Sequence, residues 1–155
     1  MAALKDRLQV DLVAAIKAHD EATKSALRMA LAAIGTEEVA GKAARELSEA
    51  EELTVLTKEV AKRKDSAEAY AAGGRDDLVA KELRAAEIVQ RYLPAALSDA
   101  ELDEIVADEV AKVAAASGEA PTMRSMGPLM KAVGPRVAGR ANGSVVAAKV
   151  RAALT

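Results

Sequence analysis

The chain is almost free of aromatic side chains, and this restricts the kind of core that it can build. It contains no phenylalanine or tryptophan and only two tyrosines, Tyr70 and Tyr92. Half of its 155 residues (51%) are nonetheless hydrophobic, so the packing must come from Leu, Val, Ile, Met and abundant Ala. Alanine is the best helix former, and runs of β-branched residues are scarce. The sequence therefore predicts a fold made of helices throughout.

Apolar residues at helical spacing predict four helices before Pro94. Asp20 is a plausible N-cap for the second helix, and Ser48 with Glu51 forms a capping box that opens the third. Gly73-Gly74 should end that third helix, because glycine adopts the left-handed conformation that a helix C-terminus favours. The residues expected to face inward are Leu4, Leu8, Leu12, Ala15 and Ile16, then Leu27, Leu31 and Ile34, then Leu53, Leu56, Val60 and Ala67, and finally Leu78, Ala85, Ile88, Val89 and Tyr92.

Three further helices are predicted after a short joint at 94–97. Ser98 and Glu101 form a second capping box. Thr122 can cap a short helix that Gly134-Pro135 should interrupt, and Asn142 can cap the last helix. The inward-facing residues are Leu102, Ile105, Val106, Glu109 and Val113, then Met126, Leu129, Met130 and Val133, and finally Val145, Val146, Val150 and Leu154.

The predicted organisation is an all-α chain of two domains. An N-terminal four-helix domain covers 1–94, and a smaller three-helix C-terminal domain covers 95–155. The N-terminus is charged and amphipathic rather than a signal peptide, and no apolar run approaches the ~18 residues that span a bilayer. These observations predict a cytoplasmic protein with no membrane contact.

The charges of the C-terminal domain are sorted along the sequence. Residues 95–119 hold seven acids and one basic residue, whereas 120–155 hold six basic residues and no acid. A basic end of this kind can capture a polyanion even though the whole chain carries a formal charge of only −2. Alternatively, the two stretches neutralise each other within one small domain. The candidate RNA-binding residues are Arg124, Lys131, Arg136, Arg140, Lys149 and Arg151.

A secondary basic cluster, Lys62-Arg63-Lys64, lies in the third predicted helix. Residues 63 and 64 fall close to the buried stripe of that helix. One of them should therefore extend along the apolar surface or pair with an acid on a neighbouring helix. Both a solvated helix face and a binding patch fit this cluster.

Residues that could perform chemistry are sparse. There is no cysteine and a single histidine, His19, which falls where the first two helices meet and is expected to be a cap or a solvated residue. A typical zinc site therefore has no ligand set. The acid pairs Glu51-Glu52 and Asp76-Asp77 diverge on a helix, and neither a phosphate-binding glycine loop nor a nucleophile with its base is present. The sequence predicts no catalytic residue, no metal site and no cofactor.

Three segments taken together resemble the GatB/YqeY family, whose free-standing members are homologous to the C-terminal tail region of the amidotransferase B subunit. The segments are Lys62-Arg63-Lys64-Asp65-Ser66; Gly74-Arg75-Asp76-Asp77-Leu78 with Glu87-Ile88 and Tyr92-Leu93-Pro94; and Met126-Gly127 with Met130, followed by Gly139-Arg140-Ala141-Asn142-Gly143. The family usually has Asp where this chain has Asn142. Both residues are good N-caps, so the turn should survive, but a role that needs a carboxylate is not carried over.

The resemblance implies an all-helical protein with a larger N-terminal and a smaller C-terminal domain. In the amidotransferase the tail helps to hold tRNA, and the family is often labelled with glutamine-dependent carbon–nitrogen ligase activity. Because this sequence contains the tail-like part alone, that label would describe the larger complex. The expected function is a non-catalytic tRNA-binding accessory module that reads folded RNA by shape, since aromatic residues for base stacking are nearly absent. The alternative is a protein adaptor that docks on an aminoacyl-tRNA synthetase or an amidotransferase.

Overall fold

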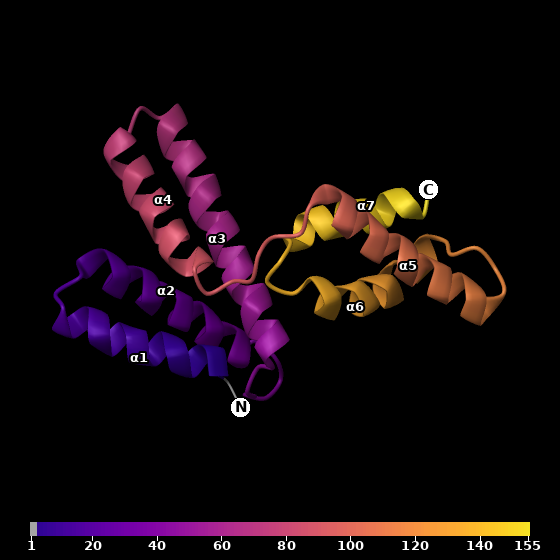
Figure 1. Cartoon of the computed structure of the whole chain (residues 1–155), viewed down its shortest axis with the longest axis horizontal. Coiled ribbons are helices and arrows are strands. Elements are labelled where there is room, and N and C mark those ends of the chain that lie inside the picture. Colours follow the sequence, from indigo (N-terminus) through magenta and orange to yellow (C-terminus); the bar gives the residue numbers. More distant parts are fainter. Residues whose placement is uncertain (1–2) are drawn as a thin grey trace. The chain divides into compact units, whose positions relative to one another are not determined.

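The computed structural model describes residues 3–155, and every regular element within them is a helix (Figure 1). The predicted all-α fold is confirmed. The chain groups into two compact units, one up to Pro94 and the other from Ala95 to Thr155. The helices are α1 (Ala3–Lys17), α2 (Glu21–Glu38), α3 (Glu49–Ala72), α4 (Asp76–Gln90), α5 (Asp99–Ser117), the 3-10 helix η1 (Met123–Ser125), α6 (Met126–Val137) and α7 (Gly143–Ala153).

The N-terminal unit consists of two helical pairs. Helix α1 packs on α2, α3 packs on α4, and α2 also contacts both members of the second pair. The core between them is aliphatic, as the composition requires. Its largest fully buried side chains are Leu8, Leu27, Ile34, Leu56 and Ile88.

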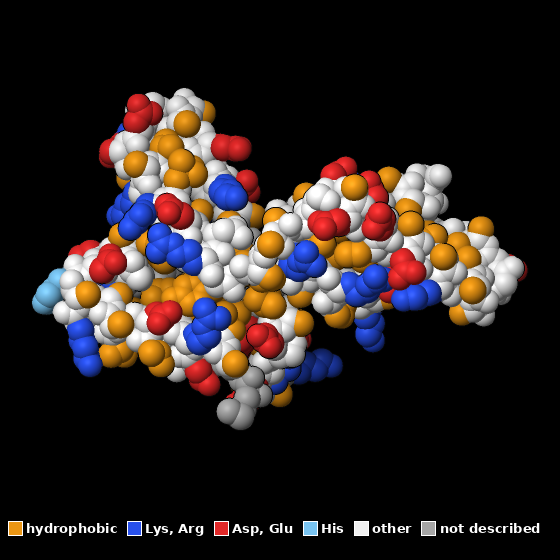
Figure 2. Space-filling model, in the orientation of Figure 1, with side chains coloured by type: hydrophobic (Ala, Val, Ile, Leu, Met, Phe, Trp, Pro, Cys, Tyr) orange, Lys and Arg blue, Asp and Glu red, His pale blue; other side chains and the backbone are white. Residues whose placement is uncertain are grey.

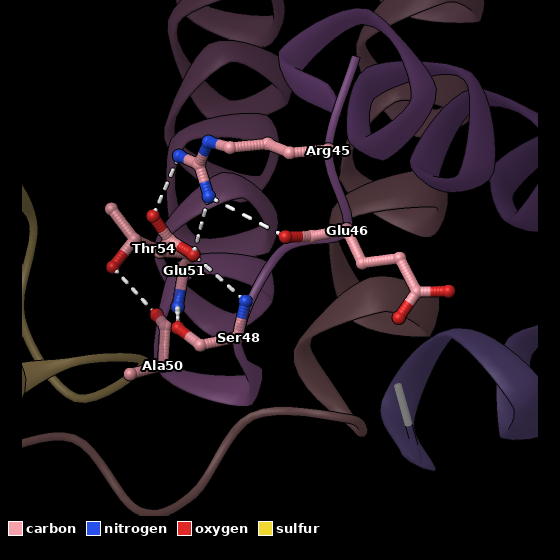
Figure 3. A network of polar contacts seen from close by, with 6 residues as sticks. All are labelled: Arg45, Glu46, Ser48, Ala50, Glu51 and Thr54. Atoms are coloured by element: carbon pink, nitrogen blue, oxygen red, sulfur yellow. Dashed lines mark hydrogen bonds and ion pairs between the residues drawn. The ribbon is translucent and has the colours of Figure 1, made fainter. Parts of the chain in front are cut away.

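The predicted capping box at the start of α3 is present, and Arg45 makes additional hydrogen bonds to it (Figure 3). Ser48 Oγ accepts the Glu51 N–H at 3.2 Å, and Glu51 Oε2 accepts the Ser48 N–H at 2.7 Å. Arg45 donates to both carboxylate oxygens of Glu51, at 3.0 and 2.7 Å. These hydrogen bonds, from Arg45 first and then from the Ser48 backbone, lower the pKa of Glu51 to about 2. The loop before α3 is therefore held to the first turn of that helix.

One predicted core residue of α1 lies on the surface. Ile16 is 43% exposed, and Val10 and Val13 beside it are 68% and 51% exposed. An α-helix turns about 100° per residue, so three steps of four residues from Leu4 to Ile16 drift by about 120° round the helix. The stripe that begins at Leu4 has thus left the buried face by Ile16, and the outer face of α1 is partly apolar.

Tyr92 fastens the end of the N-terminal unit to its first helix. Its hydroxyl donates to Asp11 Oδ2, and the Arg7 guanidinium carbon lies 5.4 Å from the ring centroid. Burial and then the Asp11 hydrogen bond raise the pKa of Tyr92. The side chain is half-buried against the core, as the sequence predicts.

The C-terminal unit packs α5, α6 and α7 against one another. Its Ser98–Glu101 capping box is present, and Asn142 caps α7 by accepting the Ser144 N–H at 3.3 Å. Its core is small and separate from that of the first unit. The buried apolar residues are Leu102, Val106, Leu129, Val133, Val137, Val146 and Val150.

The prediction that Gly134-Pro135 interrupts the short helix is wrong, because α6 continues to Val137. A proline disfavours the helical conformation of the residue before it through clashes with that residue's backbone N–H and Cβ. Gly134 has no Cβ and avoids one of these clashes, and Pro135 lies only two residues before the end of α6, so few helical hydrogen bonds are lost. Thr122 does cap the segment, but through the short η1 turn that precedes α6.

Candidate nucleic-acid interface

Arg136 of α6 is bound to the acidic helix of its own unit. Its Nη1 lies 2.6 Å from Asp108 Oδ2 and 2.8 Å from Glu109 Oε1, both on α5. Glu109 is buried (8% exposed) on the inward face predicted for it, so Arg136 supplies the positive charge that a buried carboxylate requires. The Arg136 hydrogen bonds hold the pKa values of Asp108 and Glu109 below their usual range, and the two acids raise the pKa of Arg136.

Lys149 of α7 forms the second set of contacts with α5. Its ammonium group lies 2.6 Å from Asp103 Oδ1 and 2.8 Å from Asp99 Oδ1. Hydrogen bonds to Asp103 and then Asp99 raise the pKa of Lys149. The Lys149 side chain is only 18% exposed, so this cation serves mainly to join α7 to α5.

Arg140 is engaged with backbone rather than with an acid. Its Nε donates to the Ala95 carbonyl at 3.0 Å, and its own carbonyl accepts the Leu97 N–H at 2.8 Å. These two bonds tie the turn between α6 and α7 to the segment that leads into α5. Arg140 is therefore a structural residue of the turn, and its replacement would disturb the unit itself.

Arg124, Lys131 and Arg151 differ from the other three candidates. Their side chains are exposed, and among residues 3–155 they form neither ion pairs nor side-chain hydrogen bonds. Arg124 and Lys131 are seven residues apart, about two helical turns, in a segment where η1 runs directly into α6. Both side chains should therefore project from the same side of this segment. Figure 2 shows several Lys and Arg side chains on the drawn face of the C-terminal unit.

Five of the six candidate residues thus divide into two groups, and the sixth, Arg140, is held by its backbone contacts with Ala95 and Leu97. Arg136 and Lys149 form ion pairs with acids of α5, as expected if the acidic and basic stretches neutralise each other. Polyanion capture remains open for Arg124, Lys131 and Arg151, which we call the free basic set. A phosphate can approach the free basic set without first breaking an ion pair within the described chain.

The secondary basic cluster is split between surface and interior. Arg63 is only 15% exposed; its Nη1 lies 3.3 Å from Glu82 Oε2 on α4, and its Nη2 lies 3.5 Å from Glu59 Oε2 on α3. The expected pairing with an acid on a neighbouring helix is confirmed. Lys62 and Lys64 are exposed.

Sequence reasoning missed one buried carboxylate, Glu52. It is 0% exposed, and its Oε2 accepts the Lys5 N–H in the first turn of α1 at 3.3 Å. Burial raises the pKa of Glu52, and its Oε1 has no partner among residues 3–155. The available signal was its spacing of four residues from Leu56 and eight from Val60, which places it on the buried stripe of α3. Glu52 thus caps α1 from another helix.

The remaining sequence expectations concern metals, membranes and the lone histidine. Across residues 3–155, no three potential ligand side chains gather as they would around a metal ion. No helix in that range is long and apolar enough to cross a bilayer. His19 is exposed in the turn between α1 and α2, with a left-handed φ of 55°.

A comparison with protein families decides the relationship of this chain. The model of the family described as Yqey-like protein matches residues 5–154. The chain belongs to the YqeY-like family. Curated proteins that it resembles bear the name Altered inheritance of mitochondria protein 41, mitochondrial. The protein of Saccharomyces cerevisiae (strain YJM789) is 40% identical over 98 residues, which are 62% of this chain and 51% of that protein. The Eremothecium gossypii protein is 34% identical over 100 residues, 64% of this chain and 54% of that protein.

These relatives correct the prediction of cellular location. The prediction of a cytoplasmic protein is contradicted, because the similar curated proteins are named as mitochondrial. The prediction rested on a charged N-terminal segment and on the absence of a long apolar run, and neither feature separates these compartments. The chain also spans about half the length of the curated relatives that it matches.

Proposed function

We propose that this member of the YqeY-like family is a non-catalytic accessory module that binds tRNA or another folded RNA through its C-terminal unit. The observation that carries the proposal is the free basic set: Arg124, Lys131 and Arg151 are exposed, lack acidic partners among the described residues and lie in a stretch without acids. Cationic side chains of this kind bind phosphates and release counterions.

The mode of recognition follows from the residue types present. Lys and Arg side chains contact phosphates, whereas base stacking needs aromatic side chains that this chain nearly lacks. Binding should therefore depend on the shape and backbone of a folded RNA rather than on its base sequence. The ligase chemistry associated with amidotransferases would reside in a partner enzyme, to which this module would help to present the RNA.

Replacing Arg124 and Lys131 by alanine tests this proposal. The double variant should bind tRNA about tenfold more weakly at low salt, because two phosphate contacts are lost. Its helical circular dichroism and melting temperature should match those of the wild type, since neither side chain makes an ion pair or hydrogen bond among the described residues. Affinity is measured by fluorescence anisotropy with labelled tRNA.

The matched control replaces Lys17 and Lys42, two exposed lysines of the N-terminal unit. It removes the same charge from the whole chain, and its tRNA affinity should stay within about twofold of the wild type. Equal weakening in both double variants would show a general charge effect. A folded Arg124→Ala/Lys131→Ala protein that binds as tightly as the wild type would favour the adaptor function instead.

A further inference from the structure

The N-terminal unit carries an open groove along α2. Two adjoining hollows of about 740 and 420 Å³ share Met29 and Arg63 in their lining. The larger lies between α2 and α4, and the smaller lies between α2 and α3. Figure 2 shows hydrophobic side chains along α2, with charged side chains on either side of them. The two hollows adjoin at Met29 and Arg63, and we call them together the groove.

The floor of this groove is apolar and low. Helix α2 contributes Ala22 and Ala26 to the larger hollow, Ala33 to the smaller, and Met29 to both. From Ala22 to Ala33 the rise of an α-helix is about 16 Å, or three turns. Small side chains over that length allow the backbone of another helix to approach closely, as in helix-in-groove recognition.

Among the charged residues that line the groove, more cations than acids lack a close ion-pair partner in residues 3–155. Among the lining acids, Glu59 and Glu82 pair with Arg63, and Glu21 pairs with Lys24 at 2.6 Å. The lining cations without a short ion pair among the described residues are Lys58, Lys62, Lys81 and Arg84, the last lying 3.9 Å from Glu87. Glu37 is the one acid in the lining that forms no ion pair within residues 3–155.

We propose that this groove docks an acidic amphipathic helix of a partner protein. The apolar stripe of that helix would rest on Ala22, Met29 and Ala33, and its flanking carboxylates would face Lys62 on one side and Lys81 on the other. A helix fits better than RNA, because the floor offers methyl and thioether groups where a nucleic acid would need polar or aromatic contacts. The groove lies in the N-terminal unit and the free basic set in the C-terminal unit.

The test uses a fluorescein-labelled 18-residue peptide with Ala and Leu on one helical face and Glu on both flanks. A scrambled peptide of the same composition keeps the charge but loses the apolar stripe. The designed peptide should bind the full chain in the micromolar range, and the scrambled one at least about tenfold more weakly. In nuclear magnetic resonance spectra the designed peptide should shift the Met29 methyl signal and the amides of Ser25 and Ala32.

A matched pair of variants on one helix makes the test specific. Lys62 lines the groove and Lys64 does not, although both are exposed on α3. Lys62→Glu should weaken peptide binding about tenfold through like-charge repulsion, whereas Lys64→Glu should change it less than threefold. Equal effects, equal binding of the scrambled peptide, or no binding of the designed peptide at millimolar concentration would overturn the proposal. So would tRNA shifting the Met29 signal while the designed peptide does not, and that result would assign the groove to RNA.

Discussion

Replacing Leu129 by alanine is expected to unfold the C-terminal unit while the N-terminal unit stays folded. Leu129 is 0% exposed in a core of only seven buried residues. A buried Leu→Ala substitution costs about 2–5 kcal/mol. A unit of this size has a total stability of about 3–9 kcal/mol, so the substitution removes much or all of it. The cores of the two units share no residue, which is why the loss should stay local.

The measurement is a two-dimensional amide spectrum at 25 °C. Signals from α5 to α7 should collapse to unfolded positions, and signals from α1 to α4 should keep their native dispersion. Val145→Ala is the control, because Val145 lies in the same unit but is 46% exposed. The prediction that Val145 faces inward is therefore wrong, and its truncation should cost less than about 0.5 kcal/mol. Joint unfolding of both units would contradict the description of two separately stabilised units.

Replacing Arg63 by methionine is expected to destabilise the N-terminal unit by about 2–4 kcal/mol, because it leaves carboxylates buried without their cation. Glu59 and Glu82, its partners, have side chains that are only 16% and 18% exposed. Methionine keeps much of the aliphatic volume, so packing loss contributes little. Urea unfolding followed by circular dichroism gives the free energy of unfolding.

A second substitution separates charge from packing at this position. Adding Glu82→Gln to Arg63→Met should restore at least about 1 kcal/mol, because one stranded charge is then removed. The control is Lys64→Met on the same helix, which should change stability by less than about 0.5 kcal/mol. If Arg63→Met costs no more than Lys64→Met, the Arg63 contacts do not stabilise the unit.

Features that depend on a few neighbouring residues were predictable from the sequence. The capping boxes at Ser48 and Ser98 are examples, because their hydrogen bonds join residues three positions apart. The all-α fold was predictable as well, because helix propensity and the helical spacing of apolar residues are also local properties of the sequence. Pro135 shows the limit of such rules, since α6 passes through it and ends two residues later.

Features that depend on which helices meet were not predictable. From the sequence alone, Arg136 and Lys149 were candidates both for binding RNA and for neutralising acids, and the choice depends on the packing of α6 and α7 against α5. Glu52 is a related case, because its burial follows from the contact of α3 with the start of α1. Of the six candidate RNA-binding residues, the structure leaves three, the free basic set, without a partner among residues 3–155.

The most direct test of the central claim is the salt dependence of tRNA affinity for the wild-type chain. Each phosphate contact contributes about −0.7 to −0.9 to the slope of log affinity against log salt concentration. If Arg124, Lys131 and Arg151 make the contacts while Arg136, Arg140 and Lys149 stay engaged within the unit, the slope should lie between about −2 and −3. A slope near zero would contradict RNA binding through the free basic set, and a slope of about −5 would contradict the division of the six residues.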